Sequence, residues 1–326
     1  MGMRGAALVF GLLCTVGSTV VEAQYNSALA MSALYYCKAS YCDAGTIGSW
    51  NCPPCSYHPS FTSVNVYHNM SIDSQGFTGY DTNSNTIVVA FRGSANIENW
   101  FSDLDFTFTT YPVAACNCQV HQGFFDEWLS LSSSVLADVR NLVSQYSGAQ
   151  ILVTGHSLGA AVSILAALDI VNEVTSSGVT VYNFGQPRVG DNSFAAYAAG
   201  MLPQGRQFRV THGYDPVPHV PPMFLGFLHT PHELWYDNDG STSWSSCQDS
   251  ATAEDPNCSD SIIPLDISNH LLYLGVPTEC TSSRKPQSAV KAIGSILWDA
   301  AVKKAADWKS NLDRSALRSK SKNRGI

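Results

Sequence analysis

The chain has 326 residues, of which 45% are hydrophobic and only 13% charged, so it is long and apolar enough to bury a large core. Residues 1–283 hold 7 of the 18 Lys and Arg residues but 23 of the 26 Asp and Glu residues. An acidic body of this kind excludes nucleic acid as the main partner, because phosphate contacts need a basic surface. The remaining residues, 284–326, form a basic tail.

The first 23 residues have the pattern of a secretory signal peptide. Arg4 precedes an apolar run over residues 6–21. Residues 21–23, which end in Ala23, form a sequence that a signal peptidase would cleave. A membrane anchor is the alternative, but the run is short for a bilayer and contains small and polar residues. We therefore expect a secreted protein whose mature chain begins near Gln24.

Strand-like and helical stretches alternate in the rest of the body. A helix is expected around residues 28–38, and a longer one over residues 124–146 carries apolar residues at three- and four-residue spacing. Short runs of β-branched and aromatic residues predict strands at 86–91, 151–154, 179–184 and 207–211. The alternation predicts an α/β fold over residues 24–283, with a mostly parallel central sheet and helices on both faces.

The sharpest motif is a G-x-S-x-G sequence, Gly155 to Gly159, between the strand at 151–154 and a helical run that extends to about residue 174. This is the context of a nucleophile elbow, in which a serine occupies a strained turn with its hydroxyl exposed. Ser157 is therefore the candidate nucleophile. The Leu158 N–H, at the start of the helix, is a candidate donor to an oxyanion.

A serine needs a base to remove its proton, and that base needs a carboxylate to orient it. Asp169, Asp191 and Asp215 all follow Ser157 in the chain. Only Asp215 follows a predicted strand, whereas Asp169 lies within a helix and Asp191 is expected to cap a helix over residues 192–199. Asp215 is therefore the candidate acid, with simple turn formation by an Asp-Pro pair as the alternative.

Five histidines are candidates for the base: His212, His219, His229, His232 and His270. The first two are too near Asp215 in sequence to reach it from a separate loop. The next two lie in a segment predicted to form a strand and a wall of the substrate site. His270 follows a long irregular segment that is able to return over the site, so it is the candidate base.

A second oxyanion donor is expected in the loop after an early strand. The strand at 86–91 is followed by Arg92, Gly93 and Ser94. The small side chains of Gly93 and Ser94 allow a backbone N–H to point into the site. Ser94 is the candidate donor, and an ordinary β-turn is the alternative.

Together these motifs resemble the secreted fungal lipases of the class 3 family, which are α/β-hydrolases, over roughly residues 35–281. The matching segments are Phe91–Ser94 followed by Asn99–Trp100, Gly155–Gly159, Gly185–Asp191, Asp215–His219, Phe224–His229 and His270–Leu271. The resemblance implies the triad Ser157, Asp215 and His270, with the Ser94 and Leu158 N–H groups as the oxyanion hole. Such a site needs no metal or organic cofactor.

The resemblance also implies a lid over residues 96–105, a short helix in which Asn99 precedes Trp100 and Phe101. The two aromatic side chains are expected to face the site and to lift at an oil surface. An apolar lid favours a triacylglycerol lipase acting on a lipid or ester at an oil–water interface. The alternatives are a feruloyl or other cell-wall esterase, a phospholipase A1 or galactolipase, and an inactive hydrolase fold used for binding.

The cysteine content suits an oxidising compartment. By the resemblance, the disulfide pairs are Cys42 with Cys280, Cys52 with Cys55, and Cys247 with Cys258. The pairing of Cys37, Cys116 and Cys118 is left open. Cys52 and Cys55 have the spacing of a zinc knuckle, but no second pair of ligands follows at finger spacing, so no metal site is expected.

Asn69 and Asn257 begin Asn-x-Ser sequons and are candidate glycosylation sites. The tail over residues 284–326 carries an apolar helical stripe: Val290, Ile293, Leu297, Ala301, Trp308 and Leu312. It can dock on the acidic body, make peripheral contact with an anionic membrane or oil surface, or be disordered. No obligate protein partner is implied.

Overall fold

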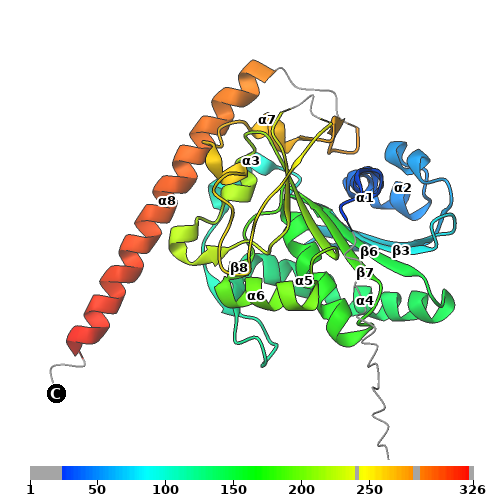
Figure 1. Cartoon of the computed structure of the whole chain (residues 1–326), viewed down its shortest axis with the longest axis horizontal. Coiled ribbons are helices and arrows are strands. Elements are labelled where there is room, and N and C mark those ends of the chain that lie inside the picture. The colour runs from blue at the N-terminus through cyan, green and yellow to red at the C-terminus, as the bar shows by residue number, and fades with distance from the viewer. Residues whose placement is uncertain (1–23, 239–241, 282–286, 323–326) are drawn as a thin grey trace, which may run out of the picture.

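The computed structural model describes residues 24–238, 242–281 and 287–322, with side chains of the last helix described from Gly294 to Ser315. The signal peptide predicted for residues 1–23 lies outside this part of the chain. The main feature is an eight-stranded sheet in the order β1-β2-β3-β6-β7-β9-β11-β12 (Figure 1).

Five neighbouring strands of this sheet are parallel: β3 (Thr86–Phe91), β6 (Gln150–His156), β7 (Val179–Phe184), β9 (Gln207–His212) and β11 (Glu233–Tyr236). Three antiparallel strands complete it: β1 (Phe61–Asn69), β2 (Ser74–Asp81) and β12 (Ser245–Ser246). The predicted mostly parallel sheet is confirmed, and each predicted strand falls on one of the parallel members.

Helices cover both faces of the sheet. On one face lie α1 (Ser27–Ser40) and α2 (Ala44–Gly48), and on the other lie α4 (Gln122–Gln145), α5 (Leu158–Glu173) and α6 (Asn192–Met201) (Figure 1). Side chains alternate along β3 accordingly. Ile87, Val89 and Phe91 join the core beneath α4 and α5, whereas Val88 and Ala90 join the core beneath α1. A strand buried on both faces reads as a continuous apolar run, which is why it was predictable.

Shorter elements complete the structure. The helical ones are η1 (Pro53–Tyr57), α3 (Ile97–Asp103), η2 (Val217–His219), η3 (Met223–Leu225), η4 (Ser259–Ser261) and α7 (Ile267–His270). A small second sheet holds β4 (Phe108–Thr110), β5 (Gln119–His121), β8 (Gly190–Asp191) and β10 (Phe227–Leu228), and β13 (Leu272–Tyr273) pairs with β14 (Val276–Pro277).

The last helix, α8 (Gln287–Lys322), runs along one flank of the domain, beside α3 and α7 (Figure 1). Of the predicted apolar stripe, Leu297 and Ala301 are buried and Trp308 is partly buried against the core, whereas Leu312 is exposed. The side chains of Val290 and Ile293 lie outside the described ones. No helix in the described part of the chain combines the length and the apolar character needed to span a bilayer.

The described residues form four disulfides: Cys42–Cys280, Cys52–Cys55, Cys116–Cys118 and Cys247–Cys258. Three of these are the pairs that the resemblance implied, and the knuckle-like Cys52 and Cys55 are bonded to each other. Cys37 is unbridged and buried, with its sulfur 2.9 Å from the Thr154 hydroxyl. Of the two sequon residues, Asn257 is exposed and Asn69 is half-buried at the end of β1.

Candidate active site

Ser157 lies at a sharp turn between β6 and α5, with a left-handed φ of +60°. Its N–H donates to the Phe184 carbonyl at 2.9 Å, which fixes the turn to β7. A Cβ atom on Gly155 would lie 2.1 Å from the Gly159 carbonyl oxygen, and one on Gly159 would lie 2.4 Å from the Phe91 carbonyl oxygen. Both positions require glycine, so the motif folds as a nucleophile elbow at the carboxyl end of a central strand.

His270 and Asp215 form a buried hydrogen bond, with 2.9 Å between Nδ1 and Oδ2. Burial alone would raise the pKa of Asp215. The nearby His270 and hydrogen bonds from His270, the Tyr273 hydroxyl and the Val217 N–H outweigh that effect, so the pKa lies below its ordinary value. Asp215 is therefore a carboxylate at neutral pH, and Nδ1 of His270 carries the hydrogen of this bond.

Ser157 and His270 line one small cavity. Ser157 Oγ and His270 Nε2 are both buried and have no hydrogen-bond partner among the described residues. The cavity has a volume of about 20 Å³, and Ser94, Ala95 and Ile97 also line it. This is the space of about one water molecule, so an ester cannot occupy it in this conformation.

His156, inside the G-x-S-x-G motif, forms a hydrogen bond to the backbone of His270. Its Nε2 donates to the His270 carbonyl at 2.8 Å, and its Nδ1 accepts from the Tyr41 hydroxyl at 2.7 Å. Burial, reinforced by His270, holds the pKa of His156 well below its usual range, so the ring is neutral. The contacts of Tyr41, His156 and Tyr273 were not predicted from the sequence, because a motif does not reveal the hydrogen-bond partners of its side chains.

The competing acids have other roles. Asp169 accepts hydrogen bonds from the Tyr111 hydroxyl at 2.5 Å and from Trp128 Nε1 at 2.7 Å. Asp191 accepts from the Phe194 N–H at 2.8 Å and caps α6, as expected.

The competing histidines have partners elsewhere. His212 Nδ1 lies 3.0 Å from the Asn269 carbonyl oxygen, His219 pairs with Asp260 at 3.2 Å, and His229 Nε2 lies 2.7 Å from the Pro218 carbonyl oxygen. The fourth, His232, lines a cavity that no triad candidate lines.

α3 lies beside the candidate oxyanion residues. Asn96 caps it by accepting from the Asn99 N–H at 3.0 Å. Trp100 stacks over Phe124 and lines a cavity of about 420 Å³ together with Ser94, Asn99 and Leu158. Phe101 is only 2% exposed, belongs to the apolar core, and lines neither this cavity nor the one at Ser157. On a helix, consecutive residues point in different directions.

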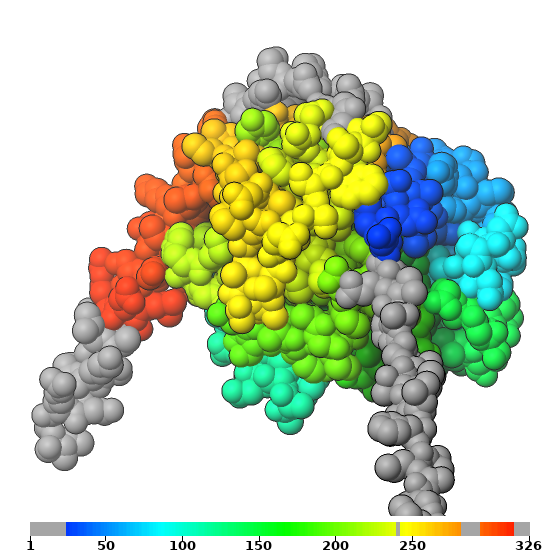
Figure 2. Space-filling view, in the orientation of Figure 1, coloured from blue at the N-terminus to red at the C-terminus, as the bar shows by residue number. Residues whose placement is uncertain are grey.

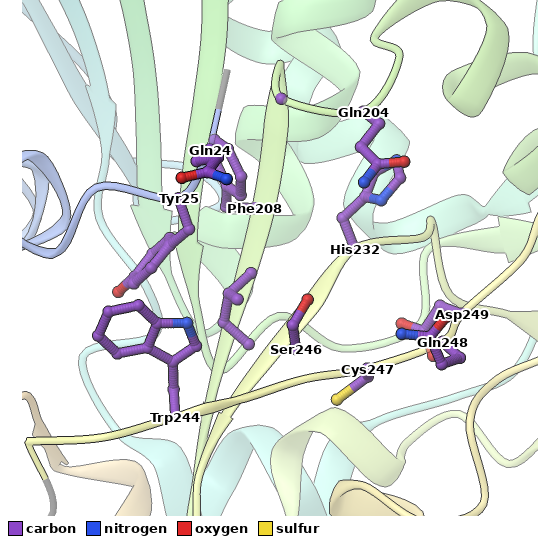
Figure 3. A pocket seen from close by; sticks show the side chains of 12 residues that line it. Gln24, Tyr25, Gln204, Phe208, His232, Trp244, Ser246, Cys247, Gln248 and Asp249 are labelled. Atoms are coloured by element: carbon purple, nitrogen blue, oxygen red, sulfur yellow. The ribbon is translucent and has the colours of Figure 1, made fainter. Parts of the chain in front are cut away.

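A third, larger cavity of about 680 Å³ lies beside β9 and β11 (Figure 3). Figure 3 shows Tyr25 and Trp244 lying close together on one side of it, with His232 and Gln204 on the other. None of the triad or oxyanion candidates lines this cavity, so it is not the candidate active site.

The parallel sheet and the elbow define an α/β-hydrolase. Comparisons with known proteins agree. The family described as lipase (class 3) matches residues 88–225. A Rhizomucor miehei lipase is 32% identical over 273 residues, which is 82% of this chain and 72% of that protein. The secreted mono- and diacylglycerol lipase 1 of Fusarium solani is 30% identical over 76% of this chain and 75% of its own length.

A solved triacylglycerol lipase, described as having a serine protease triad as its catalytic centre, superposes with a TM-score of 0.72. It is 32% identical to this chain, and the match covers 78% of this chain and 97% of that one. The chain therefore belongs to the class 3 lipase family and is a carboxylic ester hydrolase. The resemblance noted in the sequence is confirmed.

Proposed function

We propose that the chain is a secreted triacylglycerol lipase in which Ser157 is the nucleophile, His270 the base and Asp215 the acid that orients the base. The observation that carries this proposal is the buried 2.9 Å hydrogen bond between His270 and Asp215, because His270 also lines the cavity at Ser157. A strained serine beside an oriented imidazole is the arrangement needed for acyl transfer.

In the proposed cycle, Ser157 Oγ attacks the ester carbonyl as His270 Nε2 takes its proton. The Ser94 and Leu158 N–H groups stabilise the negative charge that develops on the carbonyl oxygen. Leu158 is the first residue of α5, so its N–H has no acceptor within the helix. His270 then protonates the leaving alcohol, and a water molecule repeats the cycle on the acyl-enzyme. These steps need no metal or organic cofactor.

Residues 96–105, which include α3, are the proposed lid. The 20 Å³ cavity at Ser157 admits no ester, so a segment above it has to move before substrate binds. The adjoining 420 Å³ cavity is lined by Asn99 and Trp100 from α3 and by Leu158 and Phe124 below it. Lifting α3 would join this space to the site and expose Trp100 to an acyl chain.

The proposed substrate class is triacylglycerol. The half-buried Trp100 supports it because an apolar lid opens most readily against a lipid. Partial glycerides are the second candidate, since the Fusarium solani relative is named as a mono- and diacylglycerol lipase.

Two measurements test the function. A fluorophosphonate probe is expected to label the wild-type chain at Ser157 and not the Ser157→Ala variant. Rates on triolein, diolein, phosphatidylcholine and methyl ferulate are then compared, and triolein is expected to be the best substrate. Faster turnover of methyl ferulate would instead identify a cell-wall esterase, and labelling at another residue would contradict the proposed nucleophile.

Secretion is proposed because two relatives are named as secreted lipases and because four disulfides suit an oxidising compartment. N-terminal sequencing of protein from culture medium is expected to begin at Gln24. A mobility shift on endoglycosidase treatment, lost in Asn69→Gln or Asn257→Gln, tests the proposed glycosylation sites. Peripheral contact of residues 284–326 with anionic lipid also remains a proposal.

A further inference from the structure

α8 contacts two helices that flank the candidate site. It packs against α3, where Lys304 Nζ donates to the Ser102 carbonyl at 3.0 Å. It also packs against α7, which carries His270. Gly294 makes the closest approach there, because a Cβ atom at this position would lie 2.4 Å from the Leu265 carbonyl oxygen. One helix therefore contacts both the proposed lid and the segment that holds the base.

The contact is made by a regular apolar stripe. Leu297, Ala301 and Ala305 follow one another at four-residue spacing and are at most 8% exposed. They belong to the same buried cluster as Phe101 of α3 and Leu104, which follows it. α8 thus contacts α3 and shares its buried cluster, while Glu98 and Ser102 of α3 remain exposed to solvent.

α8 also ties α3 to parts of the body outside the proposed lid. The Trp298 ring meets the His219 ring of η2 edge-on at 5.9 Å. Lys309 Nζ donates to the Phe224 carbonyl of η3 at 3.3 Å and lies 5.5 Å from the centre of the Phe224 ring. For α3 to lift, it must break its contacts with α8 or pull α8 away from η2 and η3.

We propose that α8 is a built-in inhibitor that holds α3 closed over Ser157 and must be displaced before substrate enters. The inference rests on the proposed function of α3 as the lid. Displacement exposes Phe101, Leu104 and the apolar stripe of α8. That exposure is unfavourable in water and is compensated where a lipid surface covers these side chains. The closed state is therefore stabilised in the absence of lipid.

The C-terminal part of α8 is free to begin this displacement. Residues 311–315 are all exposed, and Leu312 is 53% exposed. Figures 1 and 2 show this end of α8 projecting beyond the body. A helix end without packing opens at low cost in free energy, so separation can proceed from this end toward Gly294.

Neighbouring alanines on α8 provide matched variants of the full chain. Ala301→Glu and Ala305→Glu place a charge in the buried contact, whereas Ala300→Glu and Ala306→Glu make the same change on the exposed face. The measurement is the rate at which a small fluorophosphonate labels Ser157 in buffer without any lipid surface. We expect labelling about tenfold faster in the buried variants and an unchanged rate in the exposed ones. Equal rates in all four variants and the wild type would overturn the proposal.

Milder variants test the inference if the glutamate variants do not fold. A separate measurement distinguishes failure of this inference from failure of the lipase proposal. If a buried glutamate lowers the melting temperature sharply, the milder Lys304→Ala and Trp308→Ser variants replace it, and hydrogen exchange of residues 97–103 is measured in each. Faster exchange together with faster labelling supports the inhibitor, and unchanged exchange with unchanged labelling contradicts it. A wild-type chain that is not labelled at Ser157 even at a lipid surface, or a Ser157→Ala variant that still hydrolyses ester, would contradict the catalytic proposal whatever α8 does.

Discussion

The Tyr273 hydroxyl donates a hydrogen bond to Oδ2 of Asp215, the same oxygen that accepts the bond from His270 Nδ1. Both residues are buried, so no water replaces the hydroxyl if it is removed. The phenol itself stays protonated, because burial and the nearby Asp215 charge hold the pKa of Tyr273 well above its usual value. Asp215 thus depends on Tyr273 for part of its stabilisation as an anion.

We expect Tyr273→Phe to reduce kcat severalfold and to lower the stability of the fold by about 1–3 kcal/mol at pH 7. The pKa of Asp215 is depressed in the folded state, so its stabilising effect is present above about pH 4 and is lost as the pH falls. The stability deficit of the variant should therefore shrink toward pH 3. Tyr111→Phe removes the analogous bond to Asp169 and is expected to leave kcat unchanged.

The proposed triad is tested by combining substitutions. Ser157→Ala, His270→Ala and Asp215→Asn are each expected to reduce kcat by about 10³- to 10⁶-fold, and pairs of them should cost little more than the worse single change. Asp191→Asn is the control, since that carboxylate caps α6. Losses that multiply in the pairs, with the fold intact by circular dichroism, would mean that the three residues do not act as a unit.

The proposed lid predicts a dependence on the physical state of the substrate. The rate on tributyrin should rise steeply once its solubility limit is passed, and Trp100→Ala should blunt that rise more than it slows hydrolysis of a dissolved ester. Leu129→Ala, at an exposed position on α4, is the control. A smooth saturation curve through the solubility limit would rule out the lid.

Glu127 predicts a pH dependence of stability. Burial raises its pKa to about 7, despite the opposing charge of Arg92 and with a further contribution from Asp73. An acid whose pKa is raised by folding loses stabilisation as the pH rises from its unfolded to its folded value, because only the unfolded chain ionises in that interval. The ordinary pKa of a Glu side chain is 4.5, so the loss is expected between pH 4.5 and about 7.

Glu127→Gln removes this penalty. Its melting temperature should exceed that of the wild type increasingly across this interval and stay higher above it, corresponding to about 1–3 kcal/mol. Asp126→Asn, at the exposed neighbouring position, is expected to change the melting temperature little. A constant difference between Glu127→Gln and wild type from pH 4 to pH 8 would show that the carboxyl does not titrate in this way.

Local patterns in the sequence were sufficient for the sheet and for the elbow. The strands at 86–91 and 179–184 have the predicted bounds because both are largely buried and consist mostly of β-branched and aromatic residues. The elbow was predictable because close packing at Gly155 and Gly159 tolerates no side chain. His270 was identified by elimination, and its bond to Asp215 spans 55 residues of chain.

Contacts between distant segments were harder to predict. The apolar stripe of α8 indicated a helix that needs a partner surface, but periodicity does not say which surface. The contact of Lys304 with Ser102 of α3 joins residues 202 positions apart. Phe101 of α3 lies in the same buried cluster as the apolar stripe of α8, and α8 also packs against α7. Neither contact could be predicted from local patterns. Tyr41 and Tyr273 were missed because a single tyrosine in a sequence does not reveal its hydrogen-bond partner.

The Cys42–Cys280 disulfide joins positions 238 residues apart, so it makes the catalytic body a covalently closed ring. Cys280 precedes α8, which begins at Gln287, and α8 therefore lies outside the ring. Once α8 has left the flank, tension along the backbone from this helix reaches the crosslink before it reaches β14. In a displaced state, backbone tension would therefore end at Cys42 and Cys280 and would not pass along the chain through the segment that contains His270.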